Sequence, residues 1–82
     1  MFKNKSLDGR NNISGARIAE IRKAKAPKMS QRMLAELLQL EGLDVDKNAV
    51  QRMESGQRFI TDIEILYLCS VLDQTLDQLF KK

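Results

Sequence analysis

Apolar residues recur three or four positions apart in the first half of the chain, which is the spacing that places them on one face of a helix. The first such stretch begins at Ser14, a residue type that caps helices, and ends before Pro27, because the residue preceding a proline disfavours the helical conformation. A second stretch begins at Ser30 and stops at Gly42. The apolar positions of these two predicted helices are Ala16, Ile18, Ile21 and Ala24 in the first, and Met33, Leu34, Leu37, Leu38 and Leu40 in the second.

Three shorter helices are predicted in the second half of the chain. Asp46 is an N-cap residue type for a helix over 47–55, in which Val50 and Met53 face inward and which Gly56 ends. Two later helices begin with capping boxes, formed by Thr61 with Glu64 and by Thr75 with Gln78. The predicted inward residues of the fourth helix are Ile65, Leu68, Cys69 and Leu72, and the short fifth helix contains Leu76, Leu79 and Phe80.

This order of five helices without a convincing strand predicts an all-α fold. Residues 1–12 show no periodicity and contain polar residues and glycine, so we expect a flexible N-terminal arm there. Residues 13–82 then form a single helical domain.

Composition excludes several classes of function. The chain has no histidine and only one cysteine, Cys69, which rules out an intrachain disulfide, a Cys/His zinc site and a nucleophile activated by histidine. We therefore expect no enzyme activity, no metal and no small-molecule cofactor. No apolar run is long enough to span a bilayer, and no apolar run follows the first lysines as in a signal peptide, so we expect a cytoplasmic protein without a membrane partner.

Charge is distributed unevenly along the chain. Residues 1–33 contain nine Lys and Arg against two acids, a balance of +7, whereas residues 34–82 contain five bases against nine acids, a balance of −4. Such a polarised molecule can present one face to a polyanion, although a solvated basic face without a partner has the same pattern.

The third predicted helix has a polar side that suits DNA. Lys47, Asn48, Gln51 and Arg52 lie opposite its apolar residues, and all four carry hydrogen-bond donors. Arginine can pair with guanine, and asparagine or glutamine with adenine, when a helix enters the major groove. On this pattern alone, a helix face turned to water remains the alternative.

Three segments give a more specific indication. These are Ser-Gln-Arg-Met-Leu-Ala-Glu-Leu-Leu at 30–38, Val-Gln-Arg-Met-Glu-Ser-Gly-Gln-Arg at 50–58 and Leu-Asp-Gln-Thr-Leu-Asp-Gln-Leu-Phe at 72–80. In this register they resemble the Cro/phage-repressor (XRE-type) helix-turn-helix family. The resemblance implies a five-helix, lambda-repressor-like domain that binds double-stranded DNA sequence-specifically. It further implies a nucleoid-associated transcriptional regulator, with repression favoured over activation.

The resemblance also implies roles for individual residues. Those expected to read bases are Lys47, Asn48, Gln51 and Arg52, and those expected at the DNA backbone are Lys28, Ser30, Gln31, Arg32, Ser55, Gln57 and Arg58. Gln31 has the alternative role of bracing the third helix. Arg22 and Glu54 match a family pair that holds this helix in place. The chain departs from the family around 39–44, where the turn between the two motif helices is longer than usual, and around 26–28, which suggests a longer-turn branch.

Extra apolar residues in the last two helices suggest a protein interface. Ile63, Leu66, Tyr67 and Phe80 exceed what one small core needs, and repressor-type domains commonly bind palindromic operators as symmetric pairs. We therefore expect a weak homodimer. Packing of these residues beneath the neighbouring loop is one alternative, and a pure protein-interaction module acting through the same surface is another.

Overall fold

The computed structural model describes residues 11–80, and within this range the chain forms five α-helices and no strand. The helices are α1 (Gly15–Lys23), α2 (Gln31–Leu40), α3 (Lys47–Ser55), α4 (Asp62–Leu72) and α5 (Leu76–Leu79). This architecture confirms the predicted all-α class and the predicted order of helices. Among the described helices, none combines the length and the apolar character that crossing a bilayer requires.

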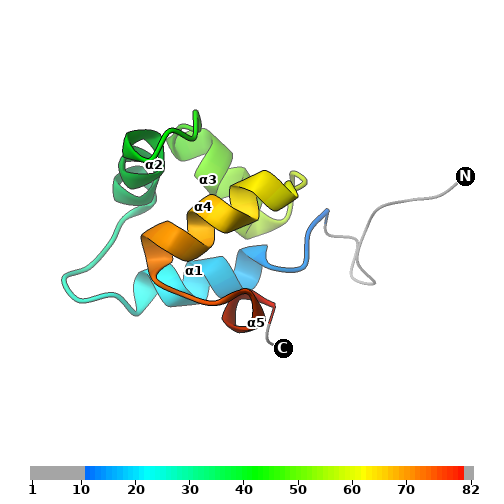
Figure 1. Ribbon diagram of the computed structural model, residues 1–82, viewed down its shortest axis with the longest axis horizontal. Coiled ribbons are helices and arrows are strands. Elements are labelled where there is room, and N and C mark those ends of the chain that lie inside the picture. Colours follow the sequence, from blue (N-terminus) through cyan, green and yellow to red (C-terminus); the bar gives the residue numbers. More distant parts are fainter. Residues whose placement is uncertain (1–10, 81–82) are drawn as a thin grey trace, which may run out of the picture.

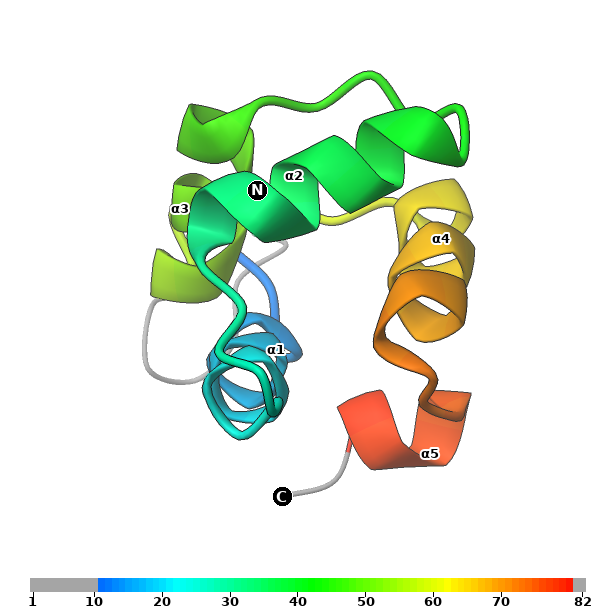
Figure 2. The same cartoon turned by 90° about the vertical axis from the view of Figure 1, so that its left-hand side faces the viewer.

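The helices surround a single core, with α3 packed against both α1 and α2. Helix α2 also packs against α4, and α5 packs against the end of α4. In Figure 2, α2 lies across the top of the molecule, with α3 and α1 on one side and α4 and α5 on the other. The successive helices α2 and α3, joined by a loop, therefore sit at one end of the fold (Figure 1).

Local capping explains where four of the helices begin, and α2 starts after Ser30, whose hydroxyl accepts from Met33 N. The Asp46 carboxylate accepts a hydrogen bond from Ala49 N at 2.8 Å, as expected for the N-cap of α3. Both predicted capping boxes are present at the starts of α4 and α5. Helix α3 ends at Gly56, whose positive φ of 81° favours glycine. These boundaries are confirmed because they depend on residues a few positions apart.

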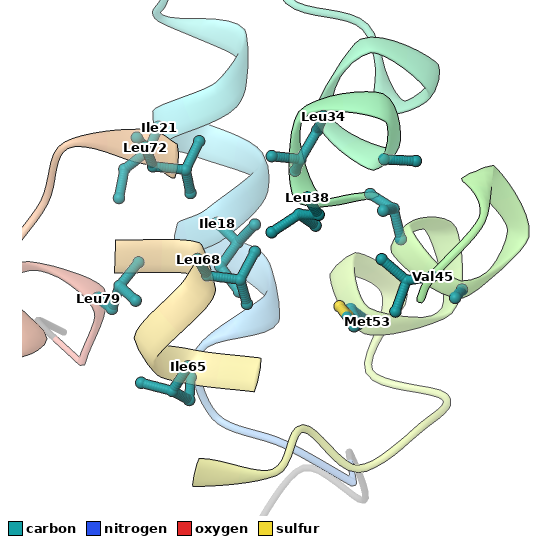
Figure 3. Close-up of a cluster of buried hydrophobic side chains, with 13 residues drawn as sticks. Ile18, Ile21, Leu34, Leu38, Val45, Met53, Ile65, Leu68, Leu72 and Leu79 are labelled. Atoms are coloured by element: carbon teal, nitrogen blue, oxygen red, sulfur yellow. The ribbon is translucent and has the colours of Figure 1, made fainter. Parts of the chain in front are cut away.

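The core combines side chains from all five helices and from the loop before α3 (Figure 3). Its buried apolar members are Ile18, Ile21, Leu34, Ala35, Leu38, Val45, Ala49, Val50, Met53, Ile65, Leu68, Leu72 and Leu79. Cys69 is half-buried beside this cluster, and burial raises the pKa of its thiol. Ala35 is a small residue on the buried side of α2.

Several apolar positions that the periodicity assigned to the core are exposed instead. Helix α2 contacts α3 and α4 along only part of its surface, so the apolar stripe is wider than the contact. Leu40 lies at the end of α2 beyond these contacts and is 82% exposed. The corrected positions are Ala16 and Ala24 in and after α1, and Met33, Leu37 and Leu40 in α2.

Helix α1 starts directly after Ser14 as predicted, but the Ser14 side chain does not cap it. Ser14 is buried with helix-like backbone angles, and its side chain makes no capping hydrogen bond. The side chain of Asn12 takes this role, because its Oδ1 accepts a hydrogen bond from Gly15 N at 2.8 Å. Asn11 and Asn12 are thus bonded to the domain, although we had placed them in the arm. The rest of the predicted arm, 1–10, lies outside the described residues.

Candidate nucleic-acid interface

Helix α3 has a buried side and an exposed polar side. Val50 and Met53 are fully buried, which fixes the side of α3 that faces the core. The side chains that we expected to read bases are all exposed: Lys47, Asn48, Gln51 and Arg52. The structure therefore brings the four predicted residues together on one solvent-facing surface of a single helix.

The orientation of α3 depends on a buried carboxylate. Glu54 accepts hydrogen bonds from Arg22 Nε at 2.6 Å and from Arg22 Nη2 at 2.9 Å. Gln31 Nε2 donates to the same carboxylate at 2.9 Å. Arg22 Nη1 also donates to the carbonyl oxygen of Met29, in the link before α2. This cluster joins α1, α2 and α3, and it places Gln31 in a bracing role.

The turn between α2 and α3 is held by a side chain of α2. Gln39 Nε2 donates to the carbonyl oxygen of Val45 at 2.7 Å, immediately before the Asp46 cap. Val45 is itself buried in the core. Gly42, with a φ of 106°, permits the reversal of the chain after α2. Gln39 and Val45 thus hold the chain that leads into the first turn of α3, a role that the sequence analysis missed.

The residues predicted to contact the DNA backbone differ in how free their side chains are. Lys28, Arg32 and Gln57 are exposed, and Arg32 forms a surface ion pair with Glu36 at 3.2 Å. Two serines are also exposed: the Ser30 hydroxyl caps α2 by accepting from Met33 N, and the Ser55 hydroxyl donates to the carbonyl oxygen of Arg52.

Arg58 is only partly available. Its Nη2 donates to Glu64 Oε2 at 2.9 Å, and the Glu64 carboxylate is nearly buried. The other oxygen of Glu64 accepts from Thr61 N in the capping box of α4. Arg58 therefore links the loop after α3 to α4, which sequence spacing did not indicate.

An open hollow of about 440 Å³ lies between the turn before α3 and the start of α4. Arg52 and Arg58 line it together with three acids, Asp44, Asp46 and Glu64. The carboxylates offset the positive potential of the two arginines at this edge of α3.

Several of the basic side chains in residues 1–33 are hydrogen-bonded to other parts of the domain. Arg17 Nε donates to the carbonyl oxygen of Gln78 at 3.0 Å, and Lys25 Nζ donates to that of Leu72 at 2.6 Å. With Arg22 in the pair described above, three of the nine bases stabilise helix packing. Lys28 and Arg32 remain exposed near the start of α2.

These observations define the class of protein. Helix α2 is followed by a short, capped α3 whose back is buried and whose polar face is exposed, and the buried Glu54 of α3 bonds to Gln31 of α2 and Arg22 of α1. This is the arrangement of a helix-turn-helix domain of a DNA-binding regulator.

Comparison with family models and with curated proteins gave no match. Comparison with solved structures gave the restriction-modification controller protein C.AhdI from Aeromonas hydrophila. The two chains are 36% identical, the match covers 82% of this chain and 91% of that chain, and the TM-score is 0.69. This chain therefore belongs to the family of restriction-modification controller proteins.

The Arg22–Glu54 pair should contribute strongly to stability. In Arg22→Met or Glu54→Gln, the remaining polar group loses its partner in a buried site, at a cost of about 3 kcal/mol. The double variant should lose less than the sum of the two single losses, because the two residues interact. Urea unfolding of the three variants measures this. Small, additive losses below about 1 kcal/mol would show that the pair behaves like an exposed one.

Proposed function

We propose that this protein is a transcription regulator that binds a specific double-stranded DNA operator with α3 in the major groove. The observation that carries the proposal is that one side of α3 is polar and exposed. The opposite side is buried in the core and held there by the ion pair between Glu54 and Arg22. The similarity to C.AhdI, a restriction-modification controller protein, supports a narrower statement, that the regulated genes belong to a restriction-modification system. The resemblance to phage repressors favours repression over activation.

Base contacts and phosphate contacts would come from different residues. Arg52 can donate two hydrogen bonds to guanine, and Asn48 and Gln51 can each pair with adenine. Lys28, Arg32 and other exposed bases would neutralise phosphates, which gives affinity without sequence information. The exposed side-chain amide of Gln57 and the remaining donors of Arg58 can add contacts to the DNA backbone from the loop after α3.

Selection of bound sequences from a random DNA pool with the purified protein tests this proposal. We expect a palindromic consensus whose half-sites are about one helical turn apart. Affinity for that site should fall steeply with salt, with a log–log slope of about −5 for about six phosphate contacts. Absence of duplex binding at low salt, or binding that does not respond to salt, would contradict the proposal.

Variants of α3 should separate base reading from backbone contact. Arg52→Ala and Asn48→Ala should each weaken binding to the selected site by about 1–3 kcal/mol and relax the preference at one position. Melting temperatures should stay close to wild type, because both side chains are exposed. Binding titrations on selected and random duplexes measure the effect. An equal loss on both duplexes would reassign these residues to the DNA backbone.

We also propose that the protein acts as a weak homodimer. Ile63 is 61% exposed, Leu66 is 63% exposed and Phe80 is 42% exposed, so these residues do not pack beneath the neighbouring loop. With the half-buried Tyr67, Ile63 and Leu66 line an open hollow of about 430 Å³ on α4. One domain reads only one half-site, and a second copy would supply the missing affinity and discrimination.

Leu66→Lys should weaken self-association and palindrome binding while the domain stays folded, because a charge would enter the proposed interface. Sedimentation with and without the selected DNA measures this. Ile13→Lys is the matched control, since Ile13 is 66% exposed and lies before α1. A wild-type protein that remains monomeric and occupies half-sites independently would contradict the dimer. Retained self-association without DNA binding would favour a protein-interaction module.

A further inference from the structure

Two asparagines before α1 are hydrogen-bonded to the far end of α3. Asn12 Nδ2 donates to the carbonyl oxygens of Met53 at 2.9 Å and Arg58 at 2.8 Å. Asn11 donates from its backbone N to Gly56 O and from its Nδ2 to Gln57 O, both at 2.8 Å. We call Asn11 and Asn12 the asparagine clip.

The clip adds hydrogen-bond partners at the end of α3. The last carbonyl groups of a helix lack their usual partners within the helix, and Met53 O accepts from Gly56 N at 3.2 Å as well as from Asn12. Gly56, whose φ is positive, forms the turn that ends α3. Met53 lies before this turn and Arg58 after it, and the side-chain amide of Asn12 donates to the carbonyl oxygens of both. The same side chain accepts from Gly15 N and thereby starts α1. One residue thus ties the first turn of α1 to the last turn of α3.

Close approach of the two helices makes this contact specific. A Cβ atom on Gly15 would lie only 2.0 Å from Met53 O, which is backbone and cannot move aside cheaply. It would also lie 2.7 Å from Asn12 Oδ1. Glycine at this position lets α1 reach α3 and lets Asn12 reach both of its carbonyl partners.

We propose that Asn12 is a positioning residue for DNA reading, an inference that rests on the proposed function. The carbonyl oxygen of Arg52 accepts hydrogen bonds from Gln57 N at 2.9 Å and Arg58 N at 3.4 Å. Arg52, which we propose reads bases, is therefore hydrogen-bonded to the loop after α3 through its backbone. Asn12 bonds to the same segment, at Met53 O and Arg58 O, and holds it against the start of α1. Binding geometry tolerates displacements of only about 0.5 Å, so loosening this segment affects reading before it unfolds the domain.

Binding of Asn12→Ala to the selected duplex and to random duplex tests the proposal, at a temperature at which circular dichroism shows the variant folded. Affinity for the selected duplex should fall about tenfold, while affinity for random duplex stays nearly unchanged. Ile21→Val is the control, since it shortens a buried core side chain of α1 and leaves the hydrogen bonds of the clip in place. It should lower the melting temperature without changing the discrimination between duplexes. Unchanged discrimination in Asn12→Ala, or an equal loss in Ile21→Val, would overturn the proposal.

A second variant covers the case in which Asn12→Ala does not fold. Asn12→Asp keeps the size of the side chain and its acceptor for Gly15 N, but it loses both donated bonds. Its added negative charge weakens binding to both duplexes alike, so the ratio of the two affinities isolates the positioning effect. That ratio should again fall about tenfold, and an unchanged ratio would overturn the proposal.

Hydrogen exchange in the absence of DNA tests the clip separately from the proposed function. Amides of residues 52–58 should exchange faster in the Asn12 variant, while those of α4 should not change. Equal exchange in variant and wild type would overturn the clip as a constraint on α3. If the wild-type protein binds no duplex, the proposed function fails, and the exchange result still decides whether Asn12 holds this end of the helix.

Discussion

The buried carboxylate of Glu54 is the interaction on which the arrangement of the first three helices depends. A carboxylate removed from water is costly unless hydrogen bonds and an opposite charge compensate it. Here α1 supplies Arg22 and α2 supplies Gln31, so the charge is satisfied only when all three helices have their observed relative positions. Apolar packing of Val50 and Met53 brings α3 to the core, and the carboxylate specifies its angle.

Helix α3 is thus fixed at its start, near its end and beyond its end by polar side chains from other segments. Gln39 holds the loop that leads into the Asp46 cap, Glu54 joins the last turn to α1 and α2, and Asn12 joins the final carbonyls to the start of α1. None of these contacts uses the exposed face of the helix. These polar interactions hold α3 in place, and its exposed face stays available for a partner.

Features set by near neighbours could be predicted from the sequence, and features set by distant neighbours could not. Asp46, Thr61 and Thr75 were identified as caps because each bonds to an amide three positions later. The same logic failed at Ser14, because the acceptor that starts α1 belongs to Asn12, which is held in place by residues more than forty positions away. Periodicity likewise overestimated the buried face of α2, since it cannot tell how far a neighbouring helix extends.

Within the proposed interface, the polar face of α3 could be predicted from the sequence. Which of the surrounding charged side chains are already bonded within the protein could not. Arg58 is paired with Glu64 across a loop, and Lys25 caps the end of α4, so residues that look alike in a charge count have different roles. Pairing of this kind depends on which loops meet in three dimensions. A count of basic residues therefore overstates the charge available to a polyanion.

The side chains of Lys47, Asn48, Gln51 and Arg52 make no hydrogen bond or ion pair with any other residue in the range 11–80. Replacing them should leave the scaffold intact, because each structural contact of α3 lies on other residues. If α3 reads DNA as proposed, evolution could change the sequence preference of such a domain through these four codons without passing through unfolded intermediates. The same separation makes them natural positions for a combinatorial library, in which new target sequences are sought on a constant framework.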